Sequence, residues 1–379
     1  MLTIKNLPFY WRFPQTLVPH SVIPQVYDFT FEVNSQLGMI IEKQDDELRR
    51  ILDAVYLENA NIGYMIDGHN LSMTYGADYL SFIRRVLNGV GGKRIVDIGC
   101  GGCTVLEQLR NENATVLGVD PSPVAMEASI QKSIPIINKF FGPGVLEKDY
   151  ADALIQMDVF EHVYNPLELL IAEKDSLSDN GYIIINVPNC EYSVKNGDIS
   201  MAIHQHVNMF TRYSLSKLVE DAGLYVASME LSGYGSALYC AATKNKTLST
   251  VSSSDFKNQI KWVNLFCENA NERIRKFRNF IDVIDNDSNV GLFVFQRALP
   301  YLAAAEQNLN KFRFFDNNVL WRGRYLDGIP VAIENIDDLL MRPTSKTLIM
   351  SNTFGMEIKS KILESVPNAK IFLQEDIFA

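Results

Sequence analysis

The stretch IVDIGCGG at residues 95–102 decides the fold of this 379-residue chain. Its apolar half predicts a buried strand that breaks into a glycine turn, and TVLEQLR at 104–110 has the spacing of an amphipathic helix. A second apolar run, VLGVD at 116–120, ends in Asp120. Glycines let a backbone approach a ligand closely, and a carboxylate at the tip of the next strand can accept both hydroxyls of a ribose. The pattern predicts a nucleoside-cofactor site at the carboxyl edge of a parallel sheet.

The glycine spacing separates two classes of nucleoside cofactor. A dinucleotide fingerprint needs a third glycine where this chain has Thr104. A carboxylate at Asp97, before the turn, has no role with a pyrophosphate but can hold the cationic amino group of S-adenosylmethionine (SAM). Asp97, Gly99, Gly101 and the later Asp120 together resemble the first motifs of the class I methyltransferases, which implies SAM as the cofactor. A βα turn without a ligand is the alternative. We expect the cofactor to be held by Asp97, Gly99, Cys100, Gly101, Asp120, Pro121 and Met157.

Composition limits the function classes. The length predicts two or three domains, and the net charge of −10 argues against a nucleic-acid partner. No apolar run approaches transmembrane length, and residues 1–24, interrupted by Pro8, Pro14 and Pro19, resemble neither a signal nor a transit peptide. Cys100 and Cys103 form a C-x-x-C pair inside the glycine turn, without a second pair, so we expect reduced thiols and no metal there. The default expectation is a cytoplasmic enzyme acting on a small molecule, with its oligomeric state open.

The order of predicted elements indicates an α/β protein of three parts. Residues 1–60 predict a small β-containing N-terminal lobe that turns helical over 44–57. Residues 61–245 alternate strand and helix, as parallel sheets do, and predict a class I methyltransferase domain with a Rossmann-like sheet. Residues 246–379 repeat the alternation and predict a second, C-terminal Rossmann-like lobe. No glycine turn follows Phe295, so we expect no nucleotide at that position.

Two local predictions concern the end of the central domain, and one concerns the last lobe. We expect a turn at 179–181 before a strand at 182–187. An antiparallel pair at 225–231 and 237–243 resembles the reversed edge strand of class I methyltransferase sheets. In the last lobe a helix is expected over 297–309.

Three segments should converge at the carboxyl edge of the sheet, namely 158–163, 188–189 and 204–210. Methyl transfer needs alignment and a base for the acceptor, and histidine suits the base role near neutral pH. We expect His206 to be the base, with His204 and His162 orienting it or binding substrate; capping or core hydrogen bonding is the alternative. The predicted substrate-binding residues are Glu161, Asn189, Gln205 and Tyr234. A metal held by the H-x-H pair and Glu161 lacks a supporting carboxylate cluster, so we expect no metal.

Several stretches resemble the deoxysugar C-methyltransferases, namely residues 134–142, HQH at 204–206, Phe210-Thr211, GYGS at 233–236 and FDNN at 315–318. This resemblance implies a zinc-binding N-terminal lobe, a catalytic second histidine in the H-x-H segment and a C-terminal Rossmann-like lobe. It also implies a sugar-nucleotide acceptor in surface-polysaccharide or secondary-metabolite synthesis.

This chain departs from that family at three places. No cysteine precedes Cys100, so a four-cysteine zinc site is not expected, and Ile203 and Gln205 replace the family's tyrosine and glutamate. Forming a carbon nucleophile requires proton removal next to a ketone and stabilisation of the enolate, which these replacements weaken. C- and O-methylation therefore both stay open. A degenerate methyltransferase that serves as a binding scaffold and an NAD-dependent oxidoreductase are the alternative functions.

Overall fold

The computed structural model describes residues 1–58, 70–233, 235–284, 289–351 and 354–378, with residues 70–73 described by their backbone alone. The chain divides into two compact units. One unit contains residues 1–32, 192–204 and 264–379, and the other contains residues 33–191 and 205–263. The second unit holds the glycine turn and is called here the catalytic unit.

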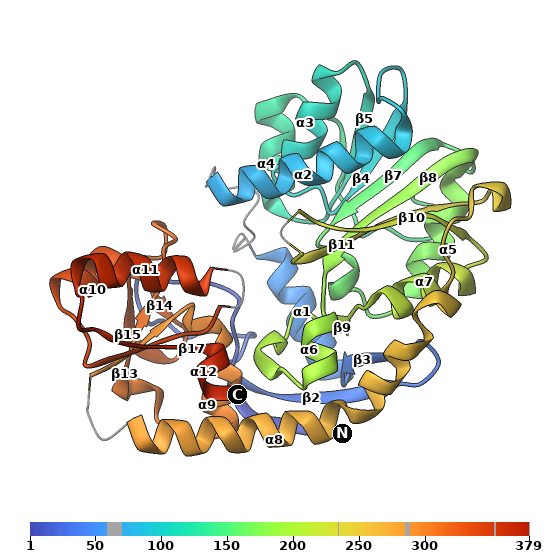
Figure 1. Cartoon of the computed structure of the whole chain (residues 1–379). Coiled ribbons are helices and arrows are strands. Elements are labelled where there is room, and N and C mark those ends of the chain that lie inside the picture. Colours follow the sequence, from blue (N-terminus) through green and yellow to red (C-terminus); the bar gives the residue numbers. More distant parts are fainter. Residues whose placement is uncertain (59–69, 234, 285–288, 352–353, 379) are drawn as a thin grey trace. The chain divides into compact units, whose positions relative to one another are not determined.

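The catalytic unit is built on a seven-stranded sheet in the order β10-β11-β8-β7-β4-β5-β6 (Figure 1). Its strands are β4 (Arg94–Ile98), β5 (Thr115–Val119), β6 (Ile136–Ile137), β7 (Ala151–Met157), β8 (Leu177–Pro188), β10 (Tyr225–Leu231) and β11 (Ala237–Thr243). Strands β8, β7, β4, β5 and β6 run parallel, whereas β11 is antiparallel to both of its neighbours. The predicted antiparallel pair is therefore confirmed. The sequence predicted that the reversed strand lies at the edge of the sheet, and this is wrong. The reversed strand is β11, which lies between β8 and β10, and β10 forms the edge.

The turn predicted at 179–181 is wrong, since β8 continues through these residues. Its pairing with β7 shifts register between Ala151, opposite Leu177, and Ala153, opposite Tyr182. A Cβ on Gly181 would lie 2.8 Å from the backbone oxygen of Asp152, so glycine lets the two strands approach closely here. The polar residues form an irregularity within the strand and do not end it.

Helices cover both faces of this sheet. Ile95 and Val96 are adjacent in β4 and point to opposite faces, as residues of a strand do. Ile95 belongs to the core with α2, α3 and α4, and Val96 to the core with α5 and α7 (Figure 1). The helices of this unit are α1 (Asp46–Leu57), α2 (Asn70–Leu87), α3 (Thr104–Asn111), α4 (Pro123–Lys132), α5 (Pro166–Ser176) and α7 (Arg212–Asp221). Strands β3 (Met39–Glu42) and β9 (Asn208–Met209) pair antiparallel in the same unit.

The other unit contains the antiparallel pair β1 (Leu2–Pro8) and β2 (Val26–Asn34) and a six-stranded sheet in the order β14-β15-β13-β12-β16-β17. The strands of this sheet are β12 (Val290–Phe293), β13 (Phe312–Phe315), β14 (Tyr325–Leu326), β15 (Ile329–Glu334), β16 (Lys346–Ile349) and β17 (Lys370–Leu373), and only β14 is antiparallel to its neighbour. The remaining α-helices among the described residues are α6 (Glu191–Asn196), α8 (Ile260–Ile284), α9 (Leu299–Ala304), α10 (Ile336–Met341), α11 (Gly355–Ser365) and α12 (Gln374–Phe378).

The helix predicted over 297–309 is shorter than expected. α9 ends at Ala304, and Glu306 adopts a left-handed backbone with φ 56°. That conformation does not continue a right-handed helix. The α/β class is confirmed, with an antiparallel N-terminal pair, a Rossmann-like central sheet and a mixed C-terminal sheet. Within the described residues, no helix combines the length and apolar character that crossing a bilayer requires.

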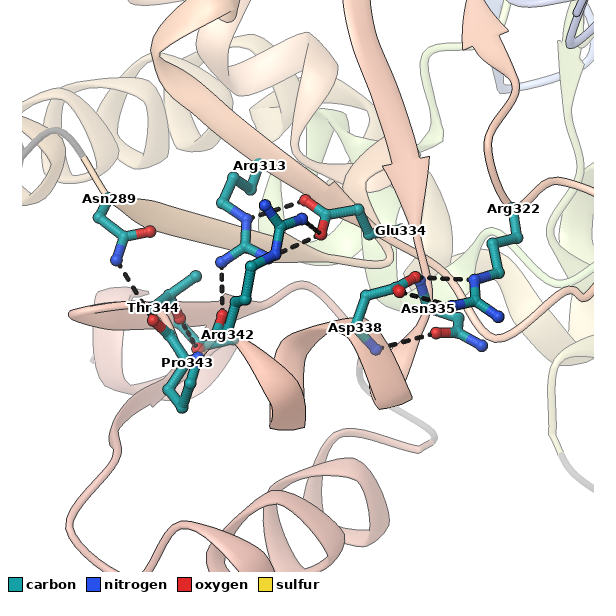
Figure 2. Close-up of polar contacts among 10 residues, drawn as sticks. Asn289, Arg313, Arg322, Glu334, Asn335, Asp338, Arg342, Pro343 and Thr344 are labelled. Carbon is teal, nitrogen blue, oxygen red and sulfur yellow. Dashed lines mark hydrogen bonds and ion pairs between the residues drawn. The ribbon is translucent and has the colours of Figure 1, made fainter.

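Arginine–carboxylate pairs link neighbouring elements of the C-terminal sheet region (Figure 2). Arg313 on β13 donates two hydrogen bonds, of 2.8 and 2.7 Å, to the two carboxylate oxygens of Glu334 at the end of β15. Arg342 donates a further one at 2.7 Å to Glu334. Arg322 forms a similar two-oxygen pair with Asp338 on α10. All of these charges are paired with one another, so this network is structural.

Candidate functional site

The glycine turn after β4 has the backbone that its sequence demands. Gly99 and Gly101 have φ of 72° and 45°, and Cys103 at the start of α3 has φ of 57°. A Cβ on Gly99 would lie only 2.6 Å from a side-chain methyl of Val159 in the loop after β7. Glycine at 99 is therefore required twice, by its dihedral and by the approach of the neighbouring loop. The turn keeps backbone exposed at the carboxyl end of β4, where a side chain would fill the space.

Asp120 joins this turn to the next helix. One carboxylate oxygen accepts the Gly101 N–H at 2.9 Å, and the other accepts the Ser122 N–H at 2.7 Å. Ser122 is the N-cap of α4, and Pro121 lies between the two. Each carboxylate oxygen has a second lone pair, so Asp120 retains acceptors for a ribose diol. Its position is the one expected of the ribose-binding acid.

Asp97 is 5 % exposed at the other side of the turn. Burial above all, and then the nearby Cys103 and Asp120, raise the pKa of its carboxyl well above the ordinary range. A bound cation would relieve this desolvation cost, which fits the cationic amino group of SAM. Together with the open turn at Gly99, these acids form a donor set that suits SAM.

Cys100 and Met157, also expected at the cofactor, lie at the same sheet edge. The Cys100 side chain packs against Gly118, where an added Cβ would be 2.5 Å from its sulfur. Met157 is the last residue of β7, half-buried beside the core on the α2 side. Their contact with a cofactor stays a prediction.

Three predicted site residues come together in the loop regions beyond β7 and before β9. The ligating atoms of Glu161, His162 and His206 all lie within 4.8 Å of one another. The rings of His162 and His206 meet edge to face with centroids 4.9 Å apart. Glu161 and His162 belong to a single 3-10 turn, Phe160–His162, which follows β7 directly. The sequence analysis expected both His204 and His162 to orient His206 or bind substrate, and of these two the structure brings His162 to His206.

The ring of His162 has a defined hydrogen-bonding state. Its Nδ1 lies 2.7 Å from the backbone oxygen of Gln205, and a carbonyl only accepts, so Nδ1 donates. Burial lowers the pKa of His162 to about 4. The ring is therefore neutral near pH 7, with the lone pair on Nε2, and Nε2 lies 3.7 Å from a carboxylate oxygen of Glu161.

Glu161 is a buried acid that lacks a hydrogen-bond partner. The side chain is 1 % exposed, and neither carboxylate oxygen receives a hydrogen bond from another described residue. Burial and then the charge of Asp158 raise the pKa of Glu161 well above its usual range. Asp158 itself has a left-handed backbone, and burial raises its pKa to about 7. The loop after β7 thus contributes two buried acids, Asp158 and Glu161, to the region of the histidine cluster.

Asn208 holds the two loops of the cluster together. Its side-chain amide donates to the backbone oxygens of Phe160 at 3.0 Å and Val163 at 2.7 Å. Backbone pairing of β9 with β3 places Asn208 opposite Ile41. The sequence prediction missed Asn208, although its place two residues after His206 was a usable signal.

Further polar groups around the cluster come from the N-terminal part of the catalytic unit. The Tyr56 ring on α1 meets His162 edge to face at 5.9 Å, and its hydroxyl is buried without a described hydrogen-bond partner. Glu42 at the end of β3 is 1 % exposed and also lacks one. Its backbone N–H donates to Val207, the residue after His206. Nothing local in the sequence linked Tyr56 or Glu42 to the histidines.

Two other predicted residues have different surroundings. His204 belongs to the other unit, is fully buried, and its Nε2 donates to the Tyr27 backbone oxygen at 2.9 Å. Its ring stacks on Phe9 at 4.5 Å. The Asn189 side chain donates to the Gly235 backbone oxygen and accepts from the Glu191 N–H, so it shapes the loop after β8. Tyr234 lies outside the described residues.

Residues 73–229 match the family model described as a methyltransferase domain. The chain is 29 % identical over 180 residues to a ubiquinone biosynthesis O-methyltransferase of Dinoroseobacter shibae, which covers 41 % of this chain and 66 % of that protein. It is 30 % identical over 122 residues to the mitochondrial ubiquinone biosynthesis O-methyltransferase of Schizosaccharomyces pombe, covering 29 % of this chain and 43 % of that protein. The chain thus spans less than two thirds of the length of these relatives.

Solved structures of similar fold include magnesium protoporphyrin IX methyltransferase from Synechocystis with bound S-adenosylhomocysteine (SAH) (TM-score 0.38, 16 % identity, 48 % of this chain and 91 % of that one). Another is a SAM-dependent methyltransferase from Aquifex aeolicus (TM-score 0.36, 16 % identity, 53 % of this chain and 98 % of that one). The family match covers the strands and turns on which Asp97, Gly99 and Asp120 lie. The chain therefore contains a class I SAM-dependent methyltransferase domain.

Proposed function

We propose that this chain transfers a methyl group from SAM to a hydroxyl oxygen of a small polar molecule. The observation that supports the proposal most directly is the cluster of Glu161, His162 and His206. It follows β7, which pairs with β4, and β4 ends at the glycine turn. Since the carboxyl ends of parallel strands open on the same crevice, an acceptor at the cluster adjoins a cofactor at the turn.

SAM supplies an already activated methyl group, so the protein has to hold the cofactor, align the acceptor and assist the loss of its proton. Asp97 would hold the amino group and Asp120 the ribose. If no metal takes part, His206 takes the acceptor proton, since it is the second histidine of the H-x-H segment and lies beside His162 in the cluster.

Two resemblances support the class of acceptor. The names of the matched relatives support an oxygen acceptor. The resemblance to deoxysugar methyltransferases supports a sugar nucleotide or a related polar metabolite, in surface-polysaccharide or secondary-metabolite synthesis. Gln205, which replaces a glutamate of that family, favours O- over C-methylation because an oxygen acceptor needs only one well-placed base.

The proposal is tested with methyl-labelled SAM and a panel of sugar nucleotides and phenols, followed by mass spectrometry of the products. One acceptor class should gain a methyl group on oxygen. His206→Ala should lower turnover by about 10²–10⁴-fold with SAH affinity unchanged, as expected for loss of acceptor activation. His20→Ala is the matched control, because the His20 ring accepts the backbone N–H groups of Val22 and Ile23 and packs against Trp11, all in the unit without the glycine turn. Full turnover of His206→Ala on the true acceptor would exclude this role.

A further inference from the structure

We infer that Glu161, His162 and His206 bind one divalent cation of the zinc class beside the methyl acceptor. Only the cation's role in the reaction rests on the proposed function, since the site itself follows from the side chains. One carboxylate and two imidazoles form the donor set of many catalytic metal centres, with three protein ligands and an open position. This inference replaces the expectation that the site holds no metal.

The spacing of the ligand atoms suits one ion. Ligands about 2.0–2.2 Å from a tetrahedral ion lie roughly 3.4 Å apart. The Nε2 of His162 and the nearest oxygen of Glu161 are 3.7 Å apart, and the His206 ligand atom lies within 4.8 Å of both. Small side-chain rotations therefore bring all three onto one centre.

His162 is oriented as metal-binding histidines are. Its Nδ1 donates to the Gln205 backbone oxygen at 2.7 Å, which leaves the lone pair on Nε2. A hydrogen bond from the outer ring nitrogen commonly fixes the tautomer and orientation of a ligating histidine. Asn208, which holds the backbone of the same turn at Phe160 and Val163, keeps the carboxylate and the ring in place.

The carboxylate of Glu161 has no hydrogen-bond partner within the described part of the chain. It is 1 % exposed, and neither oxygen receives a hydrogen bond from another described residue. Its only ion-pair contact among the described residues is with the Nε2 of His162, 3.7 Å away. Burying polar oxygens without a partner is costly. A divalent ion would coordinate these oxygens together with the two imidazoles.

The open coordination position indicates what the ion does. A hydroxyl oxygen bound there has a lowered pKa and loses its proton to water. The oxygen then forms a bond to the methyl carbon while the carbon–sulfur bond breaks and its electron pair stays on sulfur, which leaves as a neutral thioether. With the ion bound, His206 is one of its ligands, and the ion activates the acceptor in place of His206 acting as the base. The presence of two imidazoles favours Zn²⁺ or a similar ion over Mg²⁺ and Ca²⁺, which prefer oxygen ligands.

The test is metal binding by the full chain after removal of bound metal with a chelator. Titration with Zn²⁺ by calorimetry and with Co²⁺ by visible absorption should show one ion per chain and a Co²⁺ spectrum of mixed nitrogen and oxygen ligation. Glu161→Gln keeps the side-chain shape and removes the uncompensated charge, so it should fold. The variant should weaken Zn²⁺ binding by more than about 100-fold. Loss of a residue that only hydrogen-bonds to a metal ligand already costs about 10–100-fold in metal affinity, and Glu161 is itself a proposed ligand. His206→Ala should do the same.

Glu168→Gln is the matched control, because Glu168 is an exposed acid of the next helix, and it should bind Zn²⁺ like the parent. SAH affinity should be unchanged in all variants. Wild-type protein that binds no Zn²⁺ or Co²⁺, or a Glu161→Gln variant that binds Zn²⁺ like the parent, would overturn the metal site. Zn²⁺ binding at these residues without methyl transfer to any acceptor would leave the site standing and refute the proposed function. Full methyl transfer by metal-free protein would refute the cation's role alone.

Discussion

Replacing Asp120 by alanine separates the two tasks that the structure gives this carboxylate. Its oxygens accept the backbone N–H groups of Gly101 and Ser122 at 2.9 and 2.7 Å, and it is the proposed partner of the SAM ribose. Asp120→Ala therefore removes both the internal bridge from the glycine turn to α4 and the acceptor for the ribose hydroxyls. Each loss has its own measurable size.

The stability loss follows from the two backbone donors. A hydrogen bond to a charged group contributes about 1.5–3 kcal/mol, but Gly101 and Ser122 are half-exposed, so water replaces part of the loss. We expect about 1–3 kcal/mol in total, which lowers Tm by about 2–12 °C for a domain of roughly 150–250 residues. The binding loss adds the charge-assisted bonds to the ribose, again about 1.5–3 kcal/mol, or a Kd for SAH about 10–150 times higher.

Thermal unfolding of the unliganded variant measures the first effect, and calorimetric titration with SAH at a temperature where the variant is folded measures the second. Asp179→Ala is the control, because the Asp179 side chain is 93 % exposed and the substitution makes the same change in net charge. A lower Tm with normal SAH affinity would mean that Asp120 is only structural. Unchanged stability together with unchanged affinity would refute both roles.

Three further predictions concern other parts of the chain. Asn208→Ala should lower turnover about tenfold or more by loosening the turn at Glu161, with SAH affinity retained; a normal kcat would contradict its positioning role. Burial raises the pKa of Glu191, but hydrogen bonds led by that from Arg212 outweigh it and leave the pKa below its ordinary value. The Glu191 carboxylate therefore stabilises the fold above the unfolded-state pKa of about 4.3, and this stabilisation is lost as the pH falls through the lower folded-state pKa. Glu191→Gln should lower Tm at pH 7, and the Tm values of variant and wild type should converge in acid. Glu334→Gln removes the charged acceptor of Arg313 and should destabilise the C-terminal sheet by about 0.5–2 kcal/mol, seen as faster limited proteolysis; equal rates would contradict this.

Local patterns predicted most of the fold and the cofactor side of the site. The apolar runs at 225–231 and 237–243 correspond to β10 and β11, and the acid–glycine–acid pattern of Asp97, Gly99 and Asp120 lies at one sheet edge as expected. These features depend on residues close in sequence. The position of β11 between β8 and β10 could not be derived in this way, because strand order depends on which edges meet in three dimensions.

The acceptor side depends on long-range packing, which the sequence did not reveal. His204 and His206 are two residues apart, yet His204 stacks on Phe9 of the N-terminal segment and His206 meets His162. Tyr56 reaches the cluster from α1. Neither contact has a local signature, so the sequence named His204 and His162 together as partners of His206 and could not tell that His162 is the one whose ring meets it. Spacing within one loop identified the candidates but not their neighbours.

The most direct test of the central claim is the choice of cofactor by the purified protein. Thermal unfolding is measured with SAH at about 100 times its Kd from calorimetry, where a ligand that binds only the folded state adds about 2.7 kcal/mol of stability. It is measured separately with NAD over a range that includes the same concentration. The account predicts a rise in Tm with SAH, none with NAD at any concentration tested, and a much smaller rise with SAH in Asp120→Ala. Stabilisation by NAD without stabilisation by SAH would contradict the assignment of this glycine turn to SAM.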